Sequence, residues 1–309
     1  ISNISAIGTG GWLSAGIWVE NSVVLFDNVS VDRSDTGIWV QHINESQSSR
    51  PTFWDTTVTN SMYRGVMVEQ TNRSNFNSPL NAIFENLEVR GSGGPGAKTP
   101  GLCNHAIGVN TSGIDLVDSR AIDNACNGFK AYMIDSATIV DNLTIVNSGN
   151  PVATSNNDRA GLFLRSASWA SQFSNISVTG SPGHGIHLSK ASLQGNTWSS
   201  TNNSGHGLYV DESHPDVTGI SVTGNGLNGL RVYDSSNVEL YDLESADNGV
   251  LAMAPEQGFG LTFEKSNDAL SGSKNVSCTR CSSTNDAVSY THLRAHETDS
   301  YLVCRRGLE

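Results

Sequence analysis

Residues 185–232 carry one four-residue motif three times, as Gly185-Ile186-His187-Leu188, Gly207-Leu208-Tyr209-Val210 and Gly229-Leu230-Arg231-Val232. In each copy a glycine precedes an aliphatic residue, a variable residue and a second aliphatic residue. The copies start at 185, 207 and 229, which are 22 residues apart. A fixed period of this length is typical of a repeat protein, so the motif guides the interpretation of the whole chain.

The same motif extends over most of the chain. Further copies begin at Gly16, Gly37, Gly65, Gly128, Gly161 and Gly260, and a variant begins at Ala106. Between copies lies a second motif of an aromatic or aliphatic residue, two polar residues and alternating apolar residues, as in residues 173–178. Each unit therefore predicts two short strands, and no window shows helical periodicity.

Two such strands are unstable alone, but stacked copies form a folded unit. Each strand hydrogen-bonds its counterpart in the next coil, about 4.8 Å along the axis, and inward aliphatic side chains form a continuous apolar column. We expect the glycines and asparagines before each strand to occupy corners with positive φ. Stacked amides at these corners form ladders, the candidates being Asn124, Asn127, Asn203, Asn225, Asn228 and Asn248. The sequence predicts an all-β, right-handed parallel β-helix solenoid with roughly 22 residues per coil.

These repeats resemble the parallel β-helix repeats of the pectin-lyase-like superfamily, from Ile1 to about residue 286. The superfamily includes polysaccharide lyases, glycoside hydrolases, epimerases and many large surface proteins without known catalysis. The resemblance therefore implies a fold and leaves the activity open.

The repeat stops near the C-terminus. Residues 288–298 lack both the motif and its bias toward Asn, Gly and Ser, and the string resembles the translation of a widely used sequencing adapter. We therefore expect residues 1–287 to be a β-helix truncated at both ends and residues 288–309 to be a non-native tail. The tail holds Cys304, which leaves four of the five cysteines in the repeat region.

The composition excludes several classes of protein. Of 309 residues, 30 are acidic and 18 are basic, which gives a formal net charge of −12. Such a chain lacks the basic stripe that neutralises phosphates, so we expect no nucleic-acid partner. No apolar run is long enough to span a membrane. We expect an extracellular or cell-surface location, with any export signal outside this piece.

The variable residue of each motif points outward, because the aliphatic residues beside it point inward. Outward strand positions are usually polar, yet large side chains occupy this row. Aromatic rings beside cationic groups suit an extended glycan, since sugar C–H faces pack on aromatic faces. The predicted glycan-binding residues are Trp18, Trp39, Met67, Lys130, Phe163, His187, Tyr209 and Arg231. The alternative is that a long loop or a missing flanking domain covers the row.

Two histidine triplets supply the catalytic candidates. Gly183-His184-Gly185 and Gly205-His206-Gly207 are one repeat apart, so His184 and His206 should stack on adjacent coils. A Gly-His-Gly triplet resembles one element of the polygalacturonase-type hydrolases of this fold, in which paired carboxylates act as acid and base. Here the upstream segment offers the single acidic residue Asp158, and the downstream Arg-Ile-Lys motif is missing. Asp158 and His184 are thus candidates, while corner stacking imposed by the repeat is the preferred account of the histidines.

No cofactor is predicted. Asp115, Asp118 and Asp123 could cluster around Ca²⁺ but lack calcium-loop spacing. His184 with His206 would give too few ligands for zinc.

The cysteines of the repeat region fall into two pairs. Cys103 and Cys126 are about one coil apart, which fits either a disulfide or two buried thiols. Cys278 and Cys281 have CxxC spacing without a second pair, which favours a local disulfide over zinc or redox activity.

Regular repeats without a convergent acid/base set favour a non-catalytic β-helical stalk or adhesion module of an exported surface protein. Its partner would be an extracellular polysaccharide or cell-surface glycan. The alternative is a polysaccharide lyase or glycoside hydrolase whose catalytic loops lie in the insertions around 91–105 or 146–160.

Overall fold

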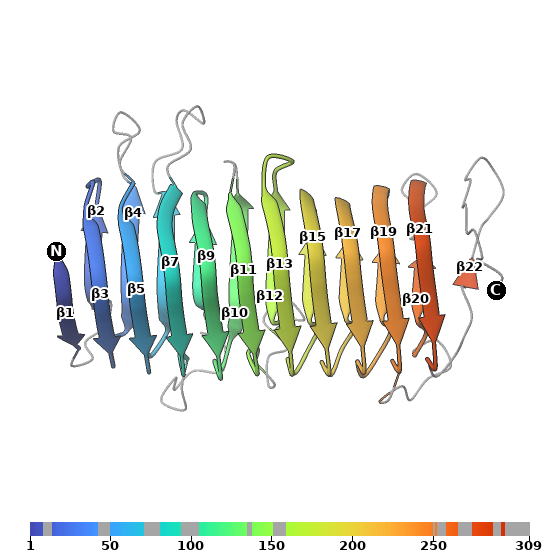
Figure 1. Cartoon of the computed structure of the whole chain (residues 1–309), viewed down its shortest axis with the longest axis horizontal. Helices are drawn as coiled ribbons and strands as arrows, with labels where there is room; N and C mark the ends of the chain where they lie inside the picture. The colour runs from blue at the N-terminus through green and yellow to red at the C-terminus, as the bar shows by residue number, and fades with distance from the viewer. Residues whose placement is uncertain are drawn as a thin grey trace.

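The computed structural model describes residues 1–8, 14–42, 50–70, 81–93, 105–134, 138–150, 159–249, 251, 258–264, 274–286 and 292–293. Successive strands alternate between two sheets of eleven strands each, so every coil contributes one strand to each sheet. The coils follow one another in chain order along the long axis of the molecule (Figure 1). Among the described residues, no helix has the length and apolar character needed to cross a membrane.

The first sheet holds the odd-numbered strands. They are β1 (Ser2–Ile7), β3 (Leu25–Asp32), β5 (Thr52–Thr59), β7 (Asn81–Arg90), β9 (Gly113–Ile122), β11 (Ile139–Val146), β13 (Gln172–Thr179), β15 (Ser192–Thr201), β17 (His214–Thr223), β19 (Ser236–Ala246) and β21 (Lys274–Thr284).

The second sheet holds the even-numbered strands, most of which contain the motif or begin directly after its glycine. They are β2 (Ala15–Glu20), β4 (Thr36–His42), β6 (Arg64–Gln70), β8 (His105–Asn110), β10 (Asn127–Ile134), β12 (Leu162–Ala167), β14 (Ile186–Ser189), β16 (Leu208–Asp211), β18 (Leu230–Tyr233), β20 (Leu261–Glu264) and β22 (His292–Leu293). Neighbouring strands are parallel, as in β14–β16 and β16–β18. The predicted parallel β-helix is confirmed.

The core is the continuous apolar column that the motif predicts. In β16 the residues on either side of Tyr209, Leu208 and Val210, are completely buried. The first sheet contributes stacked rings, with the centroids of Phe53 and Phe84 4.7 Å apart. Aliphatic and aromatic side chains thus repeat at the strand spacing, which buries apolar area in every coil.

The motif glycines do not have the positive φ that we expected. None of them lies in the left-handed region, where the positive-φ residues include Asn142 and Asn175, at bends within the strands of the first sheet. A Cβ on Gly207 would instead lie 2.7 Å from Asn225 Nδ2 and 2.7 Å from the carbonyl oxygen of Gly229. The expectation was wrong because glycine is required at these corners for steric reasons: a side chain would collide with neighbouring atoms, whereas the backbone conformation is ordinary.

Buried amides form a ladder beside these glycines. Asn203 Nδ2 donates to Asn225 Oδ1 at 2.9 Å, Asn225 Nδ2 donates to Asn248 Oδ1 at 2.8 Å, and Asn248 Nδ2 donates to Asp286 Oδ1 at 2.9 Å. We call these four residues the asparagine ladder. It confirms the predicted amide stacking for its three asparagines and ends on a carboxylate.

Candidate functional site

The variable residues of the motifs form a single row on the second sheet, which we call the outer row. Strand register pairs each member directly with the next, so the row runs along the solenoid axis. In order, its members are Trp18, Trp39, Met67, Gly108, Lys130, Phe163, His187, Tyr209, Arg231 and Thr262.

Exposure along the outer row is discontinuous. Trp18 is 59% exposed, and Trp39, Tyr209 and Arg231 are partly exposed. The residues of the middle, however, are buried, namely Met67, Lys130, Phe163 and His187. The prediction of a continuous solvent-facing strip is therefore wrong for these four positions.

Corner side chains account for part of this burial. The Nε2 atom of His105 lies 3.3 Å from the Sδ atom of Met67. A side chain at Gly108 would collide with the His105 ring, so the glycine leaves room for the imidazole to lie over the row. His105, which precedes the variant motif residue Ala106, thus packs onto the outer row from the side.

The accessible N-terminal end of the row is an aromatic platform. The rings of Trp18 and Trp39 stack with centroids 5.6 Å apart and planes 14° apart. Trp39 Nε1–H donates to Glu69 Oε1 at 2.9 Å, which fixes the orientation of its ring. The pair presents a flat, ordered apolar surface.

A second accessible group lies at β16 and β18. The Arg231 guanidinium lies 5.5 Å from the ring centroid of Tyr209 and 5.6 Å from that of Tyr233. Its Nη2 donates to Glu264 Oε2 at 2.6 Å. Burial raises the pKa of Tyr209 to about 12, so its hydroxyl keeps its proton at neutral pH. The group combines aromatic faces with one cation.

His184 and His206 stack at the corner beside Tyr209, as predicted for adjacent coils, with ring centroids 4.9 Å apart and planes 11° apart. The backbone N–H of His206 donates to His184 Nδ1 at 3.1 Å, and that of Asn228 donates to His206 Nδ1 at 3.1 Å. Each imidazole therefore accepts at Nδ1 and carries its proton on Nε2. The stack completes the hydrogen bonding of the corner backbone.

Burial controls the charge of this stack. It lowers the pKa of His184 to about 4, with smaller contributions from the cations Arg231 and Arg159. It also lowers the pKa of His206 well below the ordinary value. Both rings are neutral at neutral pH.

His187 is a feature that sequence reasoning did not single out beyond its place in the row. The ring lies 4.8 Å from that of Tyr209 and 5.0 Å from that of Phe163, centroid to centroid. Neither ring nitrogen has a hydrogen-bond partner within the described part of the chain. Burial lowers the pKa of His187 to about 3. Its place in a row of rings is the signal that could have suggested a neutral, packed imidazole.

Replacing His187 by phenylalanine should make the protein less sensitive to acid. The folded-state pKa of His187 lies below its ordinary value of 6.5, so the unfolded chain binds a proton that the folded chain lacks. This group's contribution is complete above about pH 6.5 and falls as the pH falls. Between about pH 5.5 and about pH 4.5, the free energy of unfolding should drop by about 1.4 kcal/mol less in His187→Phe than in the wild type. Urea titrations at the two pH values measure the free energy of unfolding of both proteins. An equal decrease in the two proteins would contradict the prediction.

The structure separates the three carboxylates considered for calcium. Asp115 accepts from Asn81 and Asp118 from Asn142, both at 2.6 Å, so these carboxylates face different partners. Among the described residues, no three His, Cys, Asp or Glu side chains come together as a metal site would require. The expected clustering is therefore wrong: Asp115 and Asp118 lie at separate positions along β9, and Asp123 follows the end of that strand.

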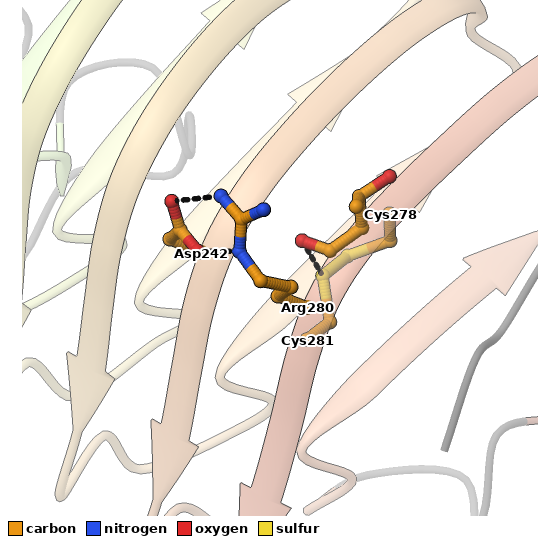
Figure 2. Close-up of a disulfide and its surroundings, with 5 residues drawn as sticks. Asp242, Cys278, Arg280 and Cys281 are labelled. Atoms are coloured by element: carbon orange, nitrogen blue, oxygen red, sulfur yellow. Dashed lines mark hydrogen bonds and ion pairs between the residues drawn. A yellow bond between two sulfur atoms is a disulfide. The ribbon is translucent and has the colours of Figure 1, made fainter. Parts of the chain in front are cut away.

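Other predicted positions have mixed outcomes. A disulfide joins Cys278 and Cys281 in β21 (Figure 2), and Cys126 is also disulfide-bonded. Cys103 and Asp158 lie outside the described residues. Of the suspected tail, the structure describes only β22, which pairs with β20.

Comparison with known proteins agrees with this architecture. Residues 160–295 match the family model described as "Right handed beta helix region". The periplasmic alginate epimerase AlgG is similar, with 13% identity, a TM-score of 0.61, and coverage of 87% of this chain and 69% of that chain. A double mutant of AlgG gives 14% identity, a TM-score of 0.63, and 87% and 67% coverage.

A tailspike is also similar in structure. The Dettilon tailspike protein (gp208) has 12% identity and a TM-score of 0.55, and the match covers 87% of this chain and 55% of that chain. No curated protein matches the sequence significantly. Likeness at these identities concerns the fold, not the activity. The chain therefore has the fold of a right-handed parallel β-helix, and residues 160–295 match the family model of that fold.

Proposed function

We propose that this chain is the glycan-contacting part of an exported β-helical surface protein, a stalk or adhesion module without catalysis. The stacked, accessible Trp18–Trp39 pair carries the proposal. Sugar rings present C–H faces that pack on aromatic faces, and a rigid pair loses little conformational entropy on binding. The partner is an extended polysaccharide or cell-surface glycan that lies along the outer row.

The group around Arg231 supports an extended ligand. It lies on the same row as the tryptophan pair, several coils further along the axis. Its tyrosine rings offer apolar surface to a second sugar ring, and the Arg231–Glu264 ion pair offers a donor and an acceptor to sugar hydroxyls. A polymer parallel to the axis would have to pass over the buried middle of the row to contact both groups.

Two observations support the remaining parts of the proposal. The backbone occupies Nδ1 of both His184 and His206, which favours a structural role for the histidine stack. Disulfide bonds at Cys126 and between Cys278 and Cys281 suit an oxidising compartment, as expected for an exported protein.

Removal of the tryptophan pair tests the binding surface. A screen on a glycan array identifies a ligand, and affinity electrophoresis with that polymer compares variants. The double variant Trp18→Ala/Trp39→Ala should bind about tenfold or more weakly, because two stacking faces are lost. Trp54 and Trp169, 41% and 51% exposed, lie outside the row, so Trp54→Ala/Trp169→Ala is the matched control and should bind like the wild type. Equal losses in both variants, or no retention of any glycan, would refute the proposal.

The same preparations decide between binding and catalysis. The alternative of a polysaccharide lyase or glycoside hydrolase predicts new unsaturated or reducing ends after incubation with pectin or alginate. Alginate is included because a similar fold occurs in an alginate epimerase. New unsaturated or reducing ends in an amount proportional to the amount of protein would overturn the proposal of a non-catalytic module. Binding without new ends would support it.

A further inference from the structure

Each strand of the first sheet bends at a residue in the left-handed region. In successive strands these residues include Gly219 (φ 72°), Asp242 (φ 53°) and Arg280 (φ 55°). Register aligns the flanking residues of β19 and β21, so Arg280 occupies the position of Asp242. Glycine, asparagine and aspartate tolerate this conformation, whereas a long side chain such as that of arginine rarely adopts it. The bend in β21 is therefore costlier than the bends in β17 and β19, although Thr197 (φ 55°) adopts the same conformation at the equivalent bend of β15, a strand without cysteine.

The disulfide spans this bend. Cys278 and Cys281 lie on either side of Arg280, with Cα atoms 5.9 Å apart (Figure 2). In register they stand opposite Leu240 and Leu243 of β19. Cys278 is buried in the core and Cys281 packs against it. The crosslink thus replaces two core leucines and closes a short loop around the left-handed residue.

The bend also directs the Arg280 side chain. The exposed guanidinium binds both carboxylate oxygens of Asp242 in the neighbouring strand, with Nη2 2.7 Å from Oδ2 (Figure 2). This two-point contact depends on the left-handed backbone, because Arg280 and Asp242 must project from equivalent bends. The disulfide therefore closes the bend within β21, and the ion pair at that bend ties β21 to β19.

We propose that the Cys278–Cys281 disulfide is a redox-sensitive latch for β21. When it is intact, it holds Arg280 in the left-handed bend and keeps β21 in register with β19. A dithiol reductant gives two electrons and two protons: the S–S bond breaks, both cysteines become thiols and the dithiol becomes a cyclic disulfide. The bend then relaxes and β21 separates from the sheet edge.

Release of β21 has a defined structural consequence. Asp286 follows this strand and accepts hydrogen bonds from the backbone N–H and the side chain of Asn248. Separation of β21 therefore removes the last rung of the asparagine ladder and exposes Leu240 and Leu243. Backbone amides of β19 and β21 should lose their protection from hydrogen exchange, whereas strands of distant coils, such as β13 and β15, should keep it.

Hydrogen exchange of the full chain with and without dithiothreitol tests the latch. Peptides from β21 should exchange at least about tenfold faster after reduction, the effect expected when the crosslink no longer restricts the open chain. Because dithiothreitol also reaches the Cys126 disulfide, the variant Cys278→Leu/Cys281→Leu provides a second test. It keeps the Cys126 disulfide, supplies the leucines found in β19, and should match the reduced wild type in β21.

Variants at the bend show whether the sensitivity of β21 to reduction depends on the left-handed Arg280 or only on the packing of the two cysteines. Arg280→Gly places at the bend the residue found in β17, so its β21 protection should change less than about threefold on reduction. Asp242→Asn weakens the ion pair but keeps the disulfide, and it should remain as sensitive to reduction as the wild type. Unchanged protection of β21 after reduction would overturn the proposal, as would equal sensitivity of Arg280→Gly and the wild type. If the leucine variant fails to fold, the measurements on wild type and Arg280→Gly still decide.

Discussion

Asn225→Asp is expected to lower the free energy of unfolding by about 4 kcal/mol at neutral pH, the cost of a buried charge without a partner. The Asn225 side chain is fully buried, and its Nδ2 donates to Asn248 Oδ1 at 2.8 Å and to the Ser200 carbonyl at 3.0 Å. Oδ1 would still accept from Asn203, but the carboxylate oxygen that replaces Nδ2 would face two oxygens that offer no proton. In acid the difference in stability between the variant and the wild type should become smaller, because a protonated carboxyl group can again donate a hydrogen bond.

Asp286→Asn is the matched control for this substitution. Asp286 accepts from Asn248 and also from the hydroxyls of Ser245 at 3.1 Å and Ser283 at 2.5 Å. An asparagine keeps Oδ1 as the acceptor for Asn248, and the serine hydroxyls can turn to accept from the new amide. The cost should stay below about 1 kcal/mol. Urea unfolding followed by circular dichroism compares the free energies of unfolding of the two variants. Similar losses would contradict our account, in which the amide hydrogen bonds of the ladder all run in one direction.

Gly207→Ala is expected to lower the free energy of unfolding by about 3 kcal/mol through overpacking. The new Cβ would lie 2.7 Å from Asn225 Nδ2, 2.7 Å from the Gly229 carbonyl oxygen and 2.9 Å from Val222 Cβ. The first two belong to the ladder and to the backbone of the next coil, so neither can move without loss of hydrogen bonds. The cost arises although the backbone of Gly207 is not left-handed.

Gly219→Ala measures the cost of a left-handed backbone at a position where an added side chain meets no close atom. Gly219 has φ 72°, and the nearest atom to its added Cβ is Thr197 N at 3.6 Å, an ordinary contact. Alanine there should cost about 1 kcal/mol from the left-handed backbone alone. Gly219→Asn should recover part of this loss, since asparagine tolerates the conformation and occurs at this bend in β11 and β13. A larger cost at Gly219 than at Gly207 would contradict our account of the motif glycines.

The sequence was sufficient to predict the strand pairing and the inward rows, because both follow from local periodicity. Leu208 and Val210 alternate around Tyr209, and the fixed repeat places each of them against its counterpart in the next coil. The asparagine ladder follows from the same register. These features depend on position along the chain, which the repeat shows directly.

The exposure of the outer row could not be predicted in the same way. Alternation shows that Met67 and His187 point away from the core, but not that His105 and His184 turn onto them at the corner. The direction of a corner side chain depends on backbone geometry that period-two patterns do not describe. For the same reason the pattern predicts a conformational role for the motif glycines, whereas close atoms such as Asn225 beside Gly207 and Val58 beside Gly37 give them a steric role.

The asparagine ladder has an electrical consequence. Each amide donates toward the next coil, from Asn203 to Asn225 and from Asn225 to Asn248, so the side-chain dipoles point in one direction along the axis. Aligned dipoles polarise one another and accumulate partial positive charge at the donating end. Asp286 places its carboxylate at that end, as an anion does at the N-terminus of an α-helix. The interior of the solenoid thus contains the counterpart of a helix macrodipole with an acidic cap.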